Sequence, residues 1–269
     1  MSIINNITMD FRKTFLLFSL PFLFSGIFAQ NKAINQNDSA GRKTGIWETY
    51  YESGRVKSHG TFNVGHPVGE LTKYYPGGIV QAVMNFDETG RISYVKMFYE
   101  TGNLASEGKY IDQKKDSVWN YFSTYDKRKA VSETYQMGKK HGLSYKYYAG
   151  GSPSEMHEWQ NNLKNGKWEQ YYENDQVRIA GGFVADSLNG AFVSYNPDGS
   201  LSITGSYQMG AMHGTWTYYS ETGEEEFSVE YIDGRMLPNA EMDKRIEEFS
   251  KKVKDIIGDI DEIENPENF

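Results

Sequence analysis

A repeat of 24 residues is the feature that most limits how this chain can fold. The segment from Gly45 to Gly54 recurs from Gly166 to Asp175 with six of its ten residues identical. Eight copies can be aligned, and they start at Gly45, Gly69, Ser93, Ser117, Gly142, Gly166, Gly190 and Gly214. The interval is 24 residues except for 25 between Ser117 and Gly142. Such a period is typical of arrays in which each unit buries its apolar face against its neighbours.

Each copy reads as two short strands joined by a turn. In the first copy the strands are predicted at 46–52 and 55–63, with Ser53-Gly54 as a two-residue turn. Strands this short that alternate with turns favour antiparallel hairpins over parallel strand–helix–strand units. We therefore expect an all-β repeat fold, an elongated antiparallel meander of about eight hairpins.

The same turn assigns a register and two faces to each hairpin. It places Tyr51 opposite Val56 and a large residue opposite glycine in four copies: Trp47–Gly60, Val95–Gly108, Trp168–Gly181 and Phe192–Gly205. An aromatic ring that covers a strand glycine is a known stabilising arrangement. The predicted core face of the first copy carries Trp47, Tyr51, Val56, Gly60 and Phe62.

The opposite face is polar apart from one aromatic residue in each copy. This row consists of Tyr50, Tyr74, Phe98, Phe122, Tyr147, Tyr171, Tyr195 and Tyr219. Tyrosine offers contact area with a hydrogen-bonding tip, so its six tyrosines are the candidate binding residues for an extended peptide or glycan. The alternative is that these rings only pack on the sheet. Strand addition at a sheet edge is a second route for a partner.

The repeat resembles a known family. Gly205-Ser-Tyr207-Gln-Met-Gly210-Ala-Met-His213-Gly214-Thr-Trp216 is similar to the MORN repeat, and the longer spacing with its Tyr-Tyr pair resembles the bacterial MORN-variant subfamily, many members of which carry an antitoxin label. The resemblance spans about residues 41–235. It implies an elongated β-structure used for protein interaction, without catalytic residues. Ser93 and Ser117 replace the opening glycine, so local irregularity is expected near 110–145.

The N-terminal segment has the three parts of a secretory signal peptide. Arg12 and Lys13 precede a short apolar run, and small residues end at Ala29. We predict a signal peptide at 1–29, with Met1 or Met9 as the start, and a linker at 30–40. An uncleaved N-terminal anchor is the alternative. Cleavage would leave no integral membrane span and place the protein in the periplasm, at the cell surface or outside the cell.

The last segment, 236–269, follows a helical pattern. Its apolar residues are spaced 4, 3, 4, 3, 4 and 3 apart, at Met242, Ile246, Phe249, Val253, Ile256, Ile260 and Ile263. This predicts a C-terminal amphipathic helix with an acidic tail. The helix either packs on the last repeat and caps the sheet or docks a partner.

Composition narrows the function. The net charge of −8 argues against a nucleic-acid partner, and the absence of cysteine excludes disulfides and thiolate chemistry. His141 and His213 share one repeat position and are interpreted as turn residues. No cofactor, metal or catalytic motif is recognised, so we do not expect an enzyme. The prediction is an exported interaction or scaffold protein that binds a protein, peptide or glycan. A toxin-neutralising partner protein is the alternative, and a cell-envelope hydrolase is a third reading.

Overall fold

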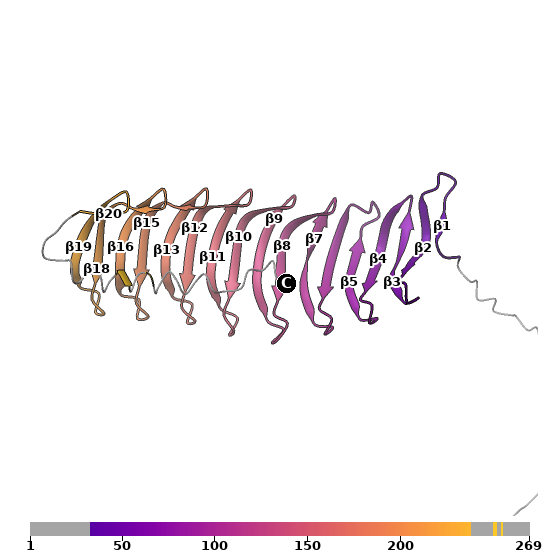
Figure 1. The fold of residues 1–269 in the computed structure, drawn as a ribbon, viewed down its shortest axis with the longest axis horizontal. Helices are drawn as coiled ribbons and strands as arrows, with labels where there is room; N and C mark the ends of the chain where they lie inside the picture. The colour runs from indigo at the N-terminus through magenta and orange to yellow at the C-terminus, as the bar shows by residue number, and fades with distance from the viewer. Residues whose placement is uncertain (1–32, 238–249, 252–253, 255–269) are drawn as a thin grey trace, which may run out of the picture. The chain divides into compact units, whose positions relative to one another are not determined.

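The computed structural model describes residues 33–237, 250, 251 and 254 of the chain. Within this part, 20 β-strands form one sheet (Figure 1). Their bounds are β1 Gln36–Asn37, β2 Lys43–Tyr50, β3 Val56–Asn63, β4 His66–Tyr74, β5 Val80–Phe86, β6 Ile92–Phe98, β7 Leu104–Ile111, β8 Lys114–Phe122, β9 Lys129–Gln136, β10 Lys139–Tyr147, β11 Pro153–Gln160, β12 Leu163–Tyr171, β13 Val177–Val184, β14 Ser187–Leu188, β15 Gly190–Tyr195, β16 Leu201–Gln208, β17 Ala211–Met212, β18 Gly214–Tyr219, β19 Glu225–Ile232 and β20 Arg235–Met236.

The strands form an antiparallel meander in chain order. Each long strand pairs with the one before it and the one after it, from β2–β3 to β18–β19. The pairs β14/β15 and β17/β18 each take the place of one long strand, interrupted at Asn189 and His213. The all-β meander predicted from the repeat is therefore confirmed, and its eight hairpins are numbered here as the first to the eighth repeat.

The hairpin loop differs from the predicted two-residue turn. Tyr51 N donates to Arg55 O, and Gly54 N donates to Tyr51 O, which makes a three-residue loop with Gly54 at a φ of 81°. Lys57 is then a bulge, because Tyr50 pairs with Val56 while Thr49 pairs with Ser58. The predicted pairing of Tyr51 with Val56 is wrong, since the longer loop and the bulge turn Val56 to the face of Tyr50.

The two-residue turns lie between repeats instead. Val64 and Gly65 connect β3 to β4, with φ angles of 49° and 85°. Two consecutive residues of positive φ define the hairpin turn whose twist matches that of the flanking strands. The same pair of positive φ angles recurs at every later turn of this kind except 87–91, and also after the last repeat: Asp112-Gln113, Met137-Gly138, Asn161-Asn162, Ala185-Asp186, Met209-Gly210 and Asp233-Gly234.

The residue that opens most repeats also has positive φ, which explains why it is usually glycine. Ser117, one of the two exceptions, keeps this conformation with a φ of 60°. At Ser93 the β5–β6 ladder runs without a register shift. The extra residue of the fourth repeat lies in its hairpin loop, where Phe122 pairs with Lys129 seven positions on. The irregularity expected near 110–145 is thus confined to this loop, and the sheet continues through it.

The predicted large-residue and glycine pairs are confirmed. Trp47, Val95, Trp168 and Phe192 lie opposite Gly60, Gly108, Gly181 and Gly205. Hereafter the Trp face is the side of the sheet that carries Trp47, Gly60 and Phe62 with their equivalents, and the Tyr face carries Tyr50 with its equivalents. The main core cluster lies on the Trp face of the sixth to eighth repeats.

Two predicted segments lie outside the described residues. The signal peptide at 1–29 falls entirely in this part, and so does nearly all of the C-terminal helix. Ser250, Lys251 and Lys254 are described and helical, but the helix as a whole stays a prediction. Within the predicted linker, β1 pairs with the start of β2.

Candidate functional site

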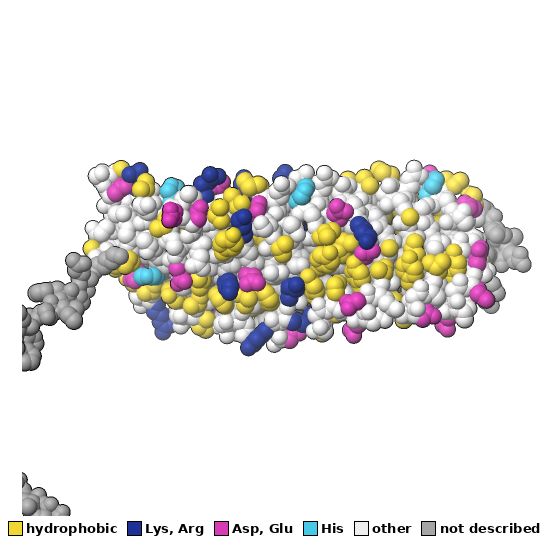
Figure 2. Space-filling view, turned by 180° about the vertical axis from the view of Figure 1, so that it is seen from behind, with side chains coloured by type: hydrophobic (Ala, Val, Ile, Leu, Met, Phe, Trp, Pro, Cys, Tyr) yellow, Lys and Arg dark blue, Asp and Glu magenta, His cyan; other side chains and the backbone are white. Residues whose placement is uncertain are grey.

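The predicted aromatic row lies along the Tyr face of the sheet. Tyr50 is 47% exposed, and the other five candidate tyrosines are half-buried. The bulge sets an aliphatic side chain opposite most of the row, at Val56, Val80, Leu104, Pro153, Val177 and Leu201. Figure 2 shows a band of hydrophobic side chains along the sheet, seen from behind. The rings therefore both pack on the sheet and remain accessible.

Several tyrosine tips of the row are held by neighbouring side chains. Tyr50 donates to Glu48, and Tyr171 Oη donates to Glu169 Oε2 at 2.6 Å. Tyr147 Oη lies 3.0 Å from Ser132 Oγ. Burial and Glu169 raise the pKa of Tyr171, so its hydroxyl stays protonated and able to donate. These bonds orient the rings in fixed positions on the surface.

The second tyrosine of the Tyr-Tyr pair joins neighbouring repeats, a role that the sequence reasoning missed. Tyr51 Oη donates to Tyr74 O at 2.6 Å, and Tyr75 Oη donates to Phe98 O at 2.8 Å. Tyr99, Tyr148 and Tyr172 repeat this bond to the carbonyl 23 residues on. The recurrence of the Tyr-Tyr pair among the repeats could have indicated this role, because a second aromatic ring that recurs in several units implies a contact of its own.

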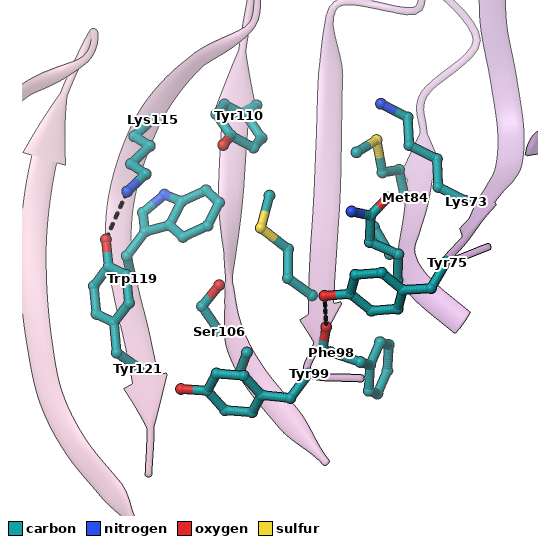
Figure 3. Close-up of a pocket in the computed structure, with 14 residues that line it drawn as sticks. Lys73, Tyr75, Met84, Phe98, Tyr99, Ser106, Tyr110, Lys115, Trp119 and Tyr121 are labelled. Atoms are coloured by element: carbon teal, nitrogen blue, oxygen red, sulfur yellow. Dashed lines mark hydrogen bonds between the residues drawn. The ribbon is translucent and has the colours of Figure 1, made fainter. Parts of the chain in front are cut away.

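A cleft lined by aromatic side chains lies on the Trp face of the second to fourth repeats (Figure 3). Its volume is ≈ 440 Å³, and its walls include Tyr75, Tyr99, Tyr110, Trp119 and Tyr121, with Met84, Met97, Lys73 and Lys115. Lys115 Nζ donates to Tyr121 Oη at 2.7 Å. Aromatic walls with a few polar groups are typical of ligand sites.

The cleft exists because one repeat position is small there. Ala82 and Ser106 occupy the position that Ile179 and Ile203 fill in the sixth and seventh repeats. These positions are equivalent because each lies opposite the fifth residue of its own repeat: Ala82 pairs with Lys73, and Ile179 pairs with Gln170. Sequence comparison between repeats could have shown this difference, but not that it opens a cavity.

A charged cluster interrupts the Trp face in the fourth to sixth repeats. Glu133 and His157 stand where four of the other repeats carry the covered glycine, and Ser144 between them replaces the tryptophan. Glu133 Oε1 lies 2.6 Å from Lys140 Nζ, and Glu155 Oε2 lies 2.9 Å from Lys146 Nζ. Together with Trp159 and Lys164 these residues line a second cleft of ≈ 220 Å³.

Burial and ion pairing set the ionisation of this cluster. Burial raises the pKa of the Glu155 carboxyl, but the hydrogen bond and charge of His157 and the charge of Lys146 outweigh it and hold the pKa below its usual range. Burial lowers the pKa of His157, and its bond to Glu155 offsets only part of this. At neutral pH the lowered pKa leaves His157 uncharged, with Nε2 as donor 3.1 Å from Glu155 Oε1; its charge acts on the Glu155 pKa only at lower pH, once the imidazole is protonated.

The other histidines have plainer surroundings. His213 accepts a hydrogen bond at its backbone carbonyl from Ser206 Oγ at 2.6 Å, at the interruption between β17 and β18. Among the described residues, no group of three or more His, Cys, Asp or Glu side chains is arranged to hold a metal ion. No helix in the described part is long and apolar enough to span a membrane.

Comparison with known proteins supports the repeat. A family model described as MORN repeat variant matches residues 43–63, 94–112 and 164–183, which are the hairpins β2–β3, β6–β7 and β12–β13. No curated protein matches the chain.

Similar solved structures include a mutant of S. aureus TarM in complex with fondaparinux, alpha-GlcNAc-glycerol and UDP. It is 13% identical at a TM-score of 0.27, and the match covers 45% of this chain and 22% of that one. The Photorhabdus luminescens Tc holotoxin pore is 11% identical at a TM-score of 0.19, over 70% of this chain and 12% of that one. The matches span a small part of both proteins, and TM-scores this low carry no argument about function.

Proposed function

The chain is a MORN repeat protein, and on that premise we propose that it is an exported, non-catalytic binding or scaffold protein. Its ligand is an extended protein segment, peptide or glycan that lies along the repeat sheet. MORN repeats are commonly used for binding, which supports the general class of function.

The cleft of ≈ 440 Å³ on the Trp face carries this proposal. Its aromatic rings come from several strands and offer flat apolar surfaces, which suit the side chain of a peptide or the face of a sugar. Lys73 and Lys115 add cationic groups at its rim and favour a ligand with an acidic or hydroxyl-rich part. Tyr75 and Tyr99 are fixed by inter-repeat hydrogen bonds, so the cleft is organised before a ligand arrives.

The aromatic row on the Tyr face is a second candidate surface. Its half-exposed rings and the hydrophobic band along the sheet in Figure 2, interrupted by charged side chains, favour contact with a long partner. The two surfaces lie on opposite faces of one sheet, so substitutions can test them separately.

Export from the cytoplasm rests on the signal-peptide pattern of 1–29. Cell fractionation of the full-length chain tests this part. We expect a shortened protein in the periplasm, at the surface or in the medium. Full-length protein confined to the cytoplasm would contradict export and leave the binding proposal standing.

Filling the cleft tests the binding site. The variant Ala82→Ile with Ser106→Ile copies residues that the sixth and seventh repeats already accommodate, so the sheet is expected to fold. In a pull-down from cell-envelope extract, partners bound by the unmodified chain should be lost by this variant. A matched variant with Tyr50, Tyr74, Tyr171 and Tyr195 changed to alanine tests the Tyr face. Retention of the same partners by both variants would overturn the proposed sites.

A further inference from the structure

The Trp face of the last three repeats is covered, although the described strands form one layer. The fifth residues of these repeats, Gln170, Ser194 and Tyr218, are 3%, 2% and 4% exposed. The same position is exposed in the first two repeats, at Thr49 and Lys73, and only half-buried in the third to fifth. The register of the hairpins is the same in both regions. The difference in exposure therefore needs an additional layer over the sixth to eighth repeats.

A polar side chain beneath this layer supports the same conclusion. Ser194 lies on the covered face at 2% exposure, and its Oγ has no hydrogen-bond partner within the described residues. On an open sheet face water would satisfy this hydroxyl. Its burial between Ile179 and Ile203 places the covering group directly over the middle of the cluster.

The chain itself leaves the sheet beside this face. Tyr231 pairs with Met236, and both residues belong to or pack against the apolar cluster. Leu237 N donates to Glu230 O at 2.9 Å and is the last described residue of the repeat sheet. The segment that follows, 238–269, thus begins at the edge of the covered surface.

The predicted stripe in this segment matches the covered surface in length. From Met242 to Ile263 a helix would extend roughly 33 Å at 1.5 Å per residue. Three repeats of two strands at about 4.8 Å extend roughly 29 Å. The apolar cluster reaches from Trp168 to Tyr231, which is those three repeats.

Charge complementarity indicates in which direction the segment runs along the sheet. After Lys254 the segment contains six acidic residues and no basic one: Asp255, Asp259, Asp261, Glu262, Glu264 and Glu267. A helix that starts at the eighth repeat and runs back along the sheet brings this acidic end to the charged cluster. There the Trp face carries four lysines, Lys115, Lys140, Lys146 and Lys164, against the two carboxylates Glu133 and Glu155.

We propose that the segment from Met242 to Ile263 is a helix that lies along the Trp face of the sixth to eighth repeats of its own chain. Its apolar stripe covers the cluster around Ile179, Ile203 and Trp216, and its acidic end meets the lysines of the fourth to sixth repeats. The helix runs along the face, in contrast to a cap on the terminal edge. It leaves the cleft of the second to fourth repeats open.

Site-specific photocrosslinking in the full-length chain tests this arrangement without any ligand. With p-benzoylphenylalanine in place of Phe249, we expect intramolecular cross-links to peptides of β15–β19. The same group in place of Lys251, which is exposed, should give none to the sheet. Cross-links between two chains, or to the turn edges alone, would overturn the proposal.

A stability comparison gives an independent readout. The variant Ile246→Glu, Phe249→Glu and Val253→Glu should lower the melting temperature by at least about 5 °C, since it removes the apolar cover. The control Lys244→Gln, Lys251→Gln and Lys254→Gln changes the net charge equally and should stay close to the unmodified chain. Equal melting temperatures for the two triple variants would contradict the proposal. Neither readout depends on the proposed binding function.

Discussion

The indole ring of Trp216 lies directly over Gly205, so that a β-carbon on this glycine would come within 3.0 Å of three ring atoms. Trp216 Nε1 donates to Ser206 O at 3.1 Å and holds the ring in this position. The ring belongs to the next repeat, whereas the residue predicted to cover Gly205 was Phe192 of its own hairpin. Trp119 covers Gly108 in the same way. The glycine is therefore a contact between repeats as well as within one.

The variant Gly205→Ala should destabilise the sheet. The added methyl group overlaps the Trp216 ring, and overpacking of a buried site costs about 1–3 kcal/mol. Urea unfolding monitored by circular dichroism measures the loss. Gly77→Ala is the control, because nothing lies within 4 Å of a β-carbon there and the residue has no positive φ. Equal midpoints for the two variants would contradict the inter-repeat contact.

The variant Tyr75→Phe tests the tyrosine bonds between repeats. It keeps the ring and removes the hydroxyl that donates to Phe98 O. We expect a loss of about 1 kcal/mol in the free energy of unfolding, the usual net value of one hydrogen bond. Tyr125→Phe, at a side chain that is 94% exposed, should have no effect. If neither substitution changes the free energy of unfolding, the tyrosine bonds between repeats do not stabilise the sheet.

Removing one partner of the ion pair between Glu133 and Lys140 should lower the stability of the fold more than replacing both partners. The Glu133 side chain is 7% exposed and that of Lys140 is 28% exposed. Lys140→Met leaves a buried carboxylate without its cation, at a cost on the order of 2–3 kcal/mol, below the range for a fully buried pair. The double variant Glu133→Gln with Lys140→Met should recover most of this stability in chemical unfolding. A double variant as unstable as the single one would show that the pair itself stabilises the fold.

Stability should fall as the pH is lowered from 7. The pKa of His157 is lower in the folded chain than its ordinary value of 6.5, so below that pH the unfolded chain binds the proton first. The Glu155 pKa is also lowered from 4.5, which removes further stability below that pH. His157→Gln should flatten the dependence of unfolding free energy on pH just below 6.5. An unchanged slope in His157→Gln would refute this assignment.

The sequence predicted the repeating part of this protein well. A period of 24 residues with one turn signal per unit is a local pattern, so it was enough to place eight hairpins and to set glycine opposite Trp47 or Phe192. It was also enough to name the tyrosine row. The predicted face of Val56 was wrong. The loop has one residue more than predicted and Lys57 forms a bulge, so the strand pairs beyond the bulge keep the predicted register, whereas Val56, between the loop and the bulge, lies on the opposite face.

Contacts between repeats were decided only by the tertiary structure. Glu133, Ser144 and His157 lie 11 to 13 residues apart in degenerate copies, and only the pairing of β9, β10 and β11 brings them into one row across the sheet. The cleft beside Trp119 likewise depends on two small residues, Ala82 and Ser106, in two different repeats. Sequence periodicity describes one unit at a time, whereas burial and cavities depend on what each unit meets across the sheet.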